Sequence, residues 1–414
     1  MDNQQVAYVA PAGFKKWSMG LMIVGLVTLI LGIIFLNPLA GAHGDNLNST
    51  RFWAVLLQNC VFWLMLTNVA TFFIVINTLA MSGWQEAFRR VTEAISSVVP
   101  VMGGITMLIF LCIVFGNRGD IYLWLDKNIV AHDVIIKGKT GFLNPAVFLI
   151  YSLLTIFLWS YWGKKLRDFS LKTDEAGPMD YETSKRWYRK SLGVSAYYVV
   201  FYVVTIGSII PWLWLMSIET HWYSTMFSWY TFGSQFVAGI ALLTLFVIYF
   251  KNRGQLPFVT NEHLQDLGKY MFAFSIFWTY LWFDQFMLQW YGNIPEETIY
   301  FKLRLQGPYE GIFYLNLILN FVCPILIFMK RATKRNYFIV TFMCILIIFG
   351  HWLDFYQIVM PGTVRMHPHL SWYEIGISLG FVGIIMWGVN RFAEKVPMTP
   401  MNNPFIKESI VHFV

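Results

Sequence analysis

Residues 17–36 read WSMGLMIVGLVTLILGIIFL, a run without a single charged side chain. The run begins directly after Lys15 and Lys16, and Asn37-Pro38 follows it with no A-x-A cleavage pattern. A helix of this length crosses a hydrocarbon core of about 30 Å. We therefore interpret the run as an uncleaved transmembrane helix, and the chain as an integral membrane protein.

The composition extends this interpretation to the whole chain. Only 13% of the 414 residues are charged and 57% are hydrophobic, whereas about a quarter of the residues of a soluble protein carry charge. The net charge of +7 could suggest a nucleic-acid partner, but the basic residues lie between apolar runs, where they fix membrane topology. We expect a single transmembrane domain, residues 1–414, with the lipid bilayer as partner and no nucleic acid.

Ten stretches are long and apolar enough to cross a membrane. Pro100, Pro211 and Pro324 fall within these stretches, and we expect them to kink the helices. The predicted fold is therefore all-α, a polytopic bundle of about ten transmembrane helices. The predicted spans are 17–36, 52–80, 95–115, 145–162, 191–217, 228–249, 270–290, 311–328, 337–359 and 372–392.

The distribution of Lys and Arg predicts the orientation, because positively charged loops resist translocation. Of the 30 Lys and Arg residues, 22 lie in the termini and alternate loops and 8 lie in the remaining loops. The loop 163–190 alone carries eight of them. The sequence therefore predicts both termini on the cytoplasmic side, which also requires an even number of spans.

The chain has no recognisable ligand set for a metal or a haem. Its four cysteines lie inside apolar spans with no C-x-x-C spacing, which favours packing over iron–sulfur or c-type haem attachment. A b-type haem in a membrane generally has two axial histidines, and His351 is the only histidine within a span. We expect no metal site and no cofactor ligated by this chain. The cysteines are Cys60, Cys112, Cys323 and Cys344.

The informative residues are the ionisable groups inside spans, which cost about 2.5 to 3.5 kcal/mol each at a helix centre. Asp284 lies four residues after Tyr280, so the two share a helix face. His351 and Asp354 are three residues apart, a spacing that suits a hydrogen bond from imidazole to carboxylate. We predict that Asp284, His351 and Asp354 are the reactive groups of a polar chamber near the outer face, lined by Tyr280, Gln285, Gln58 and Asn316.

Two uses of such a chamber remain open, beside a purely structural role as polar contacts between helices. A histidine and a carboxylate among apolar walls suit the oxidation of a quinol, whose head group must be hydrogen-bonded and deprotonated. The same residue types also pass protons. Glu219 and His221, at the outer end of the fifth span, form the mouth of the chamber, a docking point for partner subunits, or simply a solvated helix end with aromatic anchors.

Two segments resemble known membrane subunits. Residues 211–227, PWLWLMSIETHWYSTMF, followed by GSQFVAG at 233–239, resemble the polysulfide-reductase membrane-subunit (NrfD-like) family. Residues 280–298, YLWFDQFMLQWYGNIPEET, are similar to the F subunits of bacterial alternative complex III, a quinol:electron-acceptor oxidoreductase. The length and the ten-span layout of the chain match these subunits too.

The resemblance implies a subunit of a respiratory quinol-oxidising complex in the bacterial cytoplasmic membrane. Its partners would be iron–sulfur and c-type haem subunits and a homologous membrane subunit, and it would not be catalytic alone. Three functions follow: a quinone-linked electron-transfer subunit, a proton-conducting or scaffolding subunit without quinone, or an autonomous secondary transporter. The last would usually show an inverted repeat, which the sequence lacks.

Overall fold

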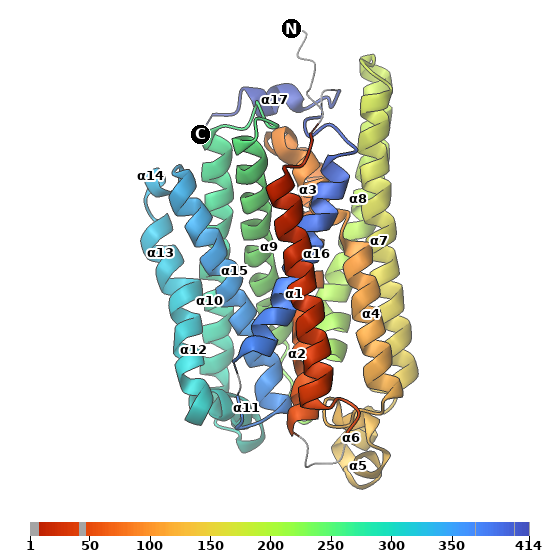
Figure 1. Ribbon diagram of the computed structural model, residues 1–414, viewed down its shortest axis with the longest axis vertical. Coiled ribbons are helices and arrows are strands. Elements are labelled where there is room, and N and C mark those ends of the chain that lie inside the picture. Colours follow the sequence, from red (N-terminus) through yellow and green to blue (C-terminus); the bar gives the residue numbers. More distant parts are fainter. Residues whose placement is uncertain (1–7, 41–46, 369, 401, 414) are drawn as a thin grey trace.

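The computed structural model describes residues 8–40, 47–368, 370–400 and 402–413. Throughout these ranges the chain is helical, without a β-strand, and the long helices run side by side along one axis (Figure 1). Nine helical stretches are long and apolar enough to cross a membrane among the residues described. This confirms a polytopic helical bundle.

The first half of the bundle contains three single helices: α1 (Ala12–Leu36), α2 (Leu47–Leu79) and α7 (Pro145–Glu175). Between α2 and α7, a third span is formed by η1 (Trp84–Phe88), α3 (Arg89–Ser96) and α4 (Val99–Phe115). After α7, a fifth span is formed by α8 (Tyr181–Val204), η3 (Thr205–Ile209), η4 (Pro211–Leu215) and η5 (Met216–Ile218). The second half contains α9 (Met226–Asn252), α10 (Asn261–Gly292), the run η6 (Gly307–Tyr309), α12 (Glu310–Leu317), η7 (Ile318–Val322) and α13 (Cys323–Phe328), then α15 (Tyr337–Thr363) and α16 (Trp372–Ala393). Short helices fill the connections: η2 (Leu123–Leu125), α5 (Lys127–His132), α6 (Val134–Lys139), α11 (Pro295–Leu305), α14 (Arg331–Lys334) and α17 (Ile406–Ile410).

The long helix α10 is absent from the nine, although it contains the predicted span 270–290. It lies in the bundle beside α9 and α13, and it extends over 32 residues. Its Trp and Tyr residues, together with Asp284 and Gln285, make it less apolar than the others. With α10, the described helices account for all ten predicted spans.

The core of the bundle is built on α2 and α9. Both are almost entirely buried, and each packs against the other and against α15. α2 also contacts α4, α8 and α16, whereas α9 also contacts α10. Because nearly every residue of these two helices is covered by protein, their polar side chains face neighbouring helices rather than lipid.

The first helix, α1, lies at the edge of the bundle and packs mainly on α16. Glycines bring the two backbones together: a Cβ atom added to Gly25 would lie 2.4 Å from the Cα atom of Gly380. A Cβ atom on Gly376 would likewise meet Thr28, with its Oγ1 only 2.2 Å away. Small residues at such a contact are typical of transmembrane helix pairs, because they permit close backbone packing.

The three prolines within predicted spans act differently. Pro100 lies in the first turn of α4, directly after a break at Ser97 and Val98, so the helical run is interrupted at this proline as expected. Pro211 begins η4, and the wider π-helical turns η3 and η4 flank it. Pro324 follows the π-helical turn η7. Widened turns of this kind occur often near functional sites.

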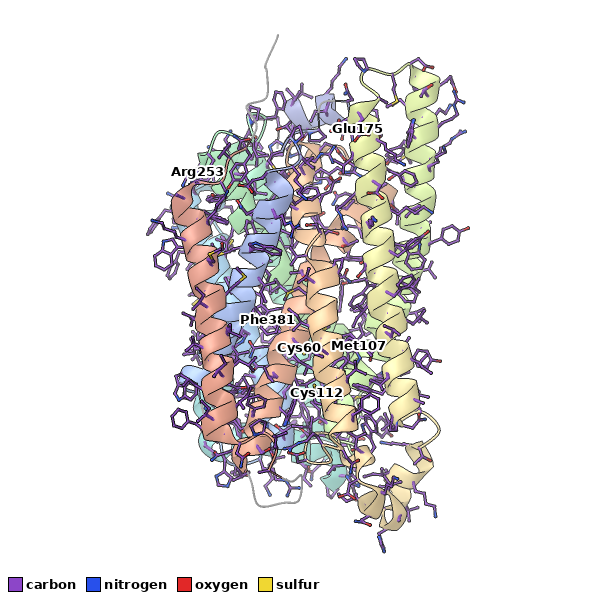
Figure 2. The ribbon with its side chains drawn as sticks, turned by 45° about the vertical axis from the view of Figure 1, so that its right-hand side comes forward. Cys60, Met107, Cys112, Glu175, Arg253 and Phe381 are labelled. Carbon is purple, nitrogen blue, oxygen red and sulfur yellow. The ribbon has the colours of Figure 1, made fainter. Side chains whose placement is uncertain are left out.

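The connections fall into two sets at opposite ends of the bundle. The terminal end holds both described termini and the connections 80–83, 176–180, 253–260 and 329–336 (Figure 1). Figure 2 shows Glu175 and Arg253 at this end. The distal end holds 116–144, 219–225 and 293–309. The connections predicted to be cytoplasmic thus lie together at the terminal end, whereas the side of the membrane that they occupy stays a prediction.

Candidate functional site

The carboxylate of Asp354 lies at the centre of a buried polar network. Oδ1 accepts hydrogen bonds from the Tyr230 hydroxyl and from Asn316 Nδ2 at 3.0 Å. Oδ2 accepts from Ser234 Oγ at 2.7 Å and from Trp278 Nε1 at 3.0 Å. Asp354 has no exposed surface. All four donors are neutral, and together they satisfy both oxygens of an ionised carboxylate.

His351 joins this network through a hydroxyl. Its Nδ1 atom lies 3.9 Å from Asp354 Oδ2, too far for a direct hydrogen bond, but only 3.0 Å from Ser234 Oγ. Its Nε2 atom is buried and has no hydrogen-bond partner among the residues that the structure describes. The Trp278 ring packs edge-on against the imidazole, with ring centroids 5.3 Å apart. Ser234 is therefore the bridge between His351 and Asp354.

Helical spacing explains why these side chains meet. Tyr230 and Ser234 are four residues apart on α9, and His351 and Asp354 are three apart on α15, so each pair shares one face. Asn320, in the π-helical turn η7, donates from Nδ2 to Asn316 Oδ1, which fixes the amide of Asn316 toward Asp354. Four helical segments thus supply the network.

A second buried group connects the network to the distal end. Tyr230, Gln285 and Arg304 line the same small pocket. The guanidinium of Arg304 lies over the Tyr300 ring, 3.4 Å from its centroid, and Nη2 donates to Glu219 Oε1 at 2.7 Å. Its other donors reach backbone carbonyl oxygens, including that of Gln357 at 2.9 Å. Arg304 is 3% exposed and Glu219 is also largely buried, so this ion pair closes the network at the distal end.

The predicted chamber residues do not all come together. Asn316 and Gln285 lie at the network or in its pocket, and His351 and Asp354 form its centre. Asp284 and Tyr280 lie on another face of α10: Tyr280 is 59% exposed. Asp284 is half-buried and makes no hydrogen bond or ion pair with any residue that the structure describes.

Gln58 belongs to a different contact between helices. It is buried on α2, and its Nε2 atom donates to the backbone oxygen of Trp352 at 3.1 Å. The neighbouring Asn59 accepts a hydrogen bond from Trp352 Nε1 at 2.9 Å. Both bonds join α2 to α15 at Trp352, the residue after His351. Successive residues of a helix point in different directions, so these bonds lie on another face of α15 than His351. Gln58 therefore positions α15 rather than lining the network.

The distal surface carries an exposed pair that involves His221. Its Nε2 atom lies 2.6 Å from Asp133 Oδ2, between η5 and α6. The backbone amide of Ile136 and the imidazole of His221 lower the pKa of Asp133, because both interactions stabilise the charged carboxylate. Of the two residues singled out near the outer end of the fifth span, Glu219 belongs to the buried site and His221 to the surface.

A separate cluster of charged residues is buried at the terminal end. Arg90 has no exposed surface; its Nη1 atom lies 2.6 Å from Glu93 Oε2, and its Nη2 atom pairs with Asp174. Arg89 lies between Glu86, at 2.9 Å, and Glu93, at 3.1 Å. The cluster is completed by Arg167, whose Nη1 atom donates to Ser96 Oγ at 2.8 Å. Two guanidinium groups, those of Arg89 and Arg90, therefore meet three carboxylates, whereas Arg167 binds the Ser96 hydroxyl beside them. We call this the charge cluster.

The C-terminal segment covers the charge cluster. Asn403 Nδ2 donates to Glu86 Oε2 at 2.7 Å, and the backbone amide of Asn402 donates to Asp174. In α17, Ser409 Oγ donates to the backbone oxygen of Trp84 at 2.6 Å and lies 3.1 Å from His263 Nε2. The segment thus binds back to its own bundle.

In the part of the chain that the structure describes, no three His, Cys, Asp or Glu side chains are placed to hold a metal ion. The four cysteines are free, and Figure 2 shows Cys60 on α2 and Cys112 on the neighbouring α4. Cys60 and Cys344 are buried, in keeping with a packing role.

Comparison with known proteins adds no family. No family model matches the chain, and no curated protein matches it.

Proposed function

We propose that this chain is a proton-conducting membrane subunit of a respiratory quinol-oxidising complex, and that His351, Ser234 and Asp354 are part of its proton path. One observation carries the proposal: Asp354 is fully buried among four neutral donors, and no cation of the described residues is in hydrogen-bonding contact with it. A structural carboxylate in a membrane is usually paired with a cation or a metal. A carboxylate held by hydroxyl, amide and indole groups instead keeps its charge available to a proton.

Ser234 gives the relay a defined order of steps. A hydroxyl both donates and accepts, so Ser234 Oγ can take a proton from His351 Nδ1 while it passes its own proton to Asp354, over 3.0 Å and 2.7 Å. Proton arrival at the buried Nε2 atom keeps the imidazole neutral as its Nδ1 proton leaves. Over one cycle the relay gains one proton at Nε2 and Asp354 releases one proton, so the number of protons in the relay is unchanged.

The path continues from Asp354 toward the distal end. Tyr230 donates to Asp354 and lines the same pocket as Gln285 and Arg304. Arg304 in turn binds Glu219, whose side chain reaches the boundary of the bundle. A carboxylate beside a fixed cation is a suitable last acceptor, because the cation favours proton release from it.

The same geometry favours the proton path over a quinone-linked site. A quinol head group would need an accessible hydrogen-bonding side chain, and His351 and Asp354 are both 0% exposed. We therefore assign no quinone to this chain. The likeness of residues 280–298 to the F subunits supplies the rest of the proposal, namely iron–sulfur and c-type haem partners, a homologous membrane subunit, and the bacterial cytoplasmic membrane.

The matched pair Asp354→Asn and Asp284→Asn tests the proposal. Both changes remove one carboxylate from a transmembrane helix, but only Asp354 belongs to the network. The chain is purified with its partners in mild detergent and reconstituted in liposomes, where quinol oxidation and the internal pH are recorded together. We expect Asp354→Asn to reduce proton movement per electron at least about tenfold, and Asp284→Asn to leave it within about twofold.

Two outcomes would contradict the proposal. If Asp354→Asn assembles normally and moves protons as the unmodified complex does, the network has only a structural role. If the chain arrives without stoichiometric partners that show c-type haem spectra, it is not a subunit of such a complex.

A further inference from the structure

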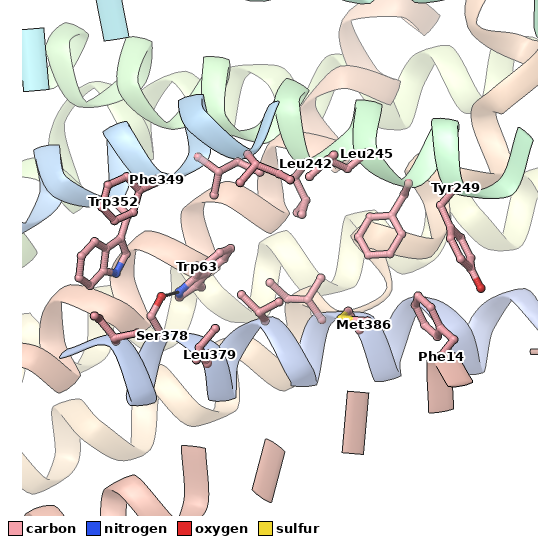
Figure 3. Close-up of a pocket in the computed structure, with 16 residues that line it drawn as sticks. Phe14, Trp63, Leu242, Leu245, Tyr249, Phe349, Trp352, Ser378, Leu379 and Met386 are labelled. Atoms are coloured by element: carbon pink, nitrogen blue, oxygen red, sulfur yellow. Dashed lines mark hydrogen bonds between the residues drawn. The ribbon is translucent and has the colours of Figure 1, made fainter. Parts of the chain in front are cut away.

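A long apolar groove lies on the side of the bundle, away from the polar network. Its volume is about 450 Å³, and five helices form its walls. Figure 3 shows Leu242, Leu245 and Tyr249 of α9 on one wall and Leu379 and Met386 of α16 on the other. The full lining is Phe14, Trp63, Leu242, Leu245, Phe246, Tyr249, Ile345, Ile348, Phe349, Trp352, Ile375, Ser378, Leu379, Val382, Ile385 and Met386.

The groove has a closed floor and a rim that opens outward. Trp352 and Ile385 on the floor are 3% and 1% exposed. Ile345, Phe349 and Ile375 at the rim are between 44% and 58% exposed. In a transmembrane bundle such a rim faces the lipid, so the groove is reached from the side and not from water.

The shape and chemistry of the groove suit an extended hydrocarbon chain. Ile375 and Met386 are eleven residues apart on α16, which corresponds to a length of about 17 Å along the helix. The Trp63 indole, whose N–H is its only polar group, already donates to Ser378 Oγ at 3.2 Å. The lining thus offers van der Waals contact along its length and little to hydrogen-bond a polar ring.

One end of the groove is positively charged. The guanidinium of Arg253 lies 5.6 Å from the ring centroid of Tyr249, a lining residue at the terminal end. Arg253 is exposed and forms no ion pair with the residues that the structure describes. The terminal end also carries most of the Lys and Arg residues of the chain. A head group at this end of the groove would therefore meet a cation at the depth where lipid phosphates lie.

We infer that the groove binds one acyl chain of an anionic phospholipid, whose head group lies beside Arg253. Charge complementarity selects this occupant over a neutral lipid, and the extended apolar lining accommodates its hydrocarbon chain. The inference is independent of the proton path, because no residue of the groove belongs to the network of Asp354.

Native mass spectrometry of the full chain in detergent tests the inference with two lipids of identical acyl chains, phosphatidylglycerol and phosphatidylcholine. We expect the unmodified chain to retain one phosphatidylglycerol and to bind it several-fold more tightly than phosphatidylcholine. Val382→Phe fills the middle of the groove, and we expect it to weaken binding of both lipids at least tenfold. Its control is Val24→Phe, on the exposed face of α1 outside the groove, which should change neither.

Arg253→Gln tests the contribution of the lipid head group separately from that of the acyl chain. We expect it to abolish the preference for phosphatidylglycerol while phosphatidylcholine still binds. Its control, Arg391→Gln, removes an exposed cation that packs on Trp387, outside the groove, and should leave the preference intact. If Val382→Phe is not monodisperse, Leu245→Phe on the opposite wall repeats the test.

Three results would overturn the inference. These are equal binding of the two lipids by the unmodified chain, full lipid retention in both groove-filling variants, and stoichiometric displacement of the lipid by a long-tailed quinone. The last result would assign the groove to a quinone tail.

Discussion

The charge cluster at the terminal end and the Asp354 network in the distal half handle buried charge in opposite ways. In the charge cluster, three carboxylates pair with the guanidinium groups of Arg89 and Arg90, and the C-terminal segment covers them. In the network, one carboxylate meets only neutral hydroxyl, amide and indole donors. Neither Arg90 nor Asp354 has any exposed surface.

The two arrangements affect different properties: the paired charges of the cluster act on stability, and the carboxylate of the network acts on proton transfer. Paired charges neutralise one another, so removing one partner leaves the other buried without compensation. Neutral donors supply no compensating charge to the carboxylate, and two of the four are hydroxyl groups that can also accept a proton. The comparison therefore predicts that variants of the charge cluster chiefly lower stability, whereas variants of the network chiefly lower proton movement.

The largest effect is expected for Arg90→Met in the charge cluster. The change leaves Glu93 and Asp174 without their shared cation, which should lower the free energy of unfolding by about 3 to 5 kcal/mol. Titration with sodium dodecyl sulfate measures it. Lys172→Met, an exposed cation on α7, is the control and should stay within about 0.5 kcal/mol. A loss below about 1 kcal/mol for Arg90→Met would show that the ion pairs of the charge cluster do not chiefly stabilise the fold.

A smaller loss is expected for Asn316→Leu in the network. It removes the donor that lies 3.0 Å from Asp354 Oδ1 and should lower the free energy of unfolding by about 1 to 3 kcal/mol. The same titration, with the double variant Asn316→Leu and Asp354→Asn, measures the coupling between the two residues. Strictly additive losses would show that Asn316 does not act through Asp354.

Ser234→Ala distinguishes proton movement from stability most clearly, because it should cost little stability. One lost hydroxyl corresponds to about 1 kcal/mol, yet it removes the bridge between His351 and Asp354. We expect proton movement per electron to fall at least about tenfold. Ser234→Thr retains the hydroxyl and should keep most of the activity. Equal activity of the alanine and threonine variants would remove Ser234 from the path.

The smallest effect is local and depends on pH. His263 lies in the first turn of α10, outside the predicted span, against Ser409 of α17. Burial, followed by the charge of His412, lowers the pKa of His263 to about 4, while Asp266 opposes the shift. Because this pKa lies below the ordinary value of about 6.5, docking of α17 is at full strength above pH 6.5 and weakens as the pH falls toward 4.

Hydrogen exchange of residues 406–410, corrected for the intrinsic rate at each pH, measures this docking. Exchange should rise as the pH falls from 6.5, and His263→Gln should make it nearly independent of pH. A pH dependence that survives in His263→Gln would assign the effect to His412 and Asp266, which are 2.7 Å apart.

The sequence predicts the bundle well because membrane helices are specified by long apolar runs and by where Lys and Arg lie. All ten predicted spans are helical in the structure, including 270–290 of α10, which is less apolar than the other nine. The break between α3 and α4, at Ser97 and Val98, lies directly before Pro100, where the sequence predicts a kink.

The site is predicted only where two residues on one helix carry the signal. The spacing of His351 and Asp354 identifies the centre of the network, but the bridging hydroxyl of Ser234 comes from another helix and is one serine among many. Asp284 is misplaced for a geometric reason: successive residues of a helix point about 100° apart, so Gln285 faces the pocket and Asp284 does not.

Two sets of ion pairs were not predicted, those between Glu86 and Glu93 and that of Arg304, and the sequence indicates the first set more clearly than the second. The segment from Glu86 to Glu93 contains opposite charges at spacings of three and four, which predicts helical ion pairs even in a presumed loop. Arg304 gives a weaker signal, since a lone arginine in a connection is normally solvated. Only the fold of α11 against α15 shows that its guanidinium turns inward.

The glycine contact joins α1 and α16, two helices that lie far apart in the sequence and are therefore synthesised at different times. Gly25 lies in the first and Gly380 in the last of the transmembrane helices that the structure describes. At about 5 to 20 residues per second, the chain between them takes tens of seconds to synthesise. α1 is therefore made well before α16, the helix that its glycines contact.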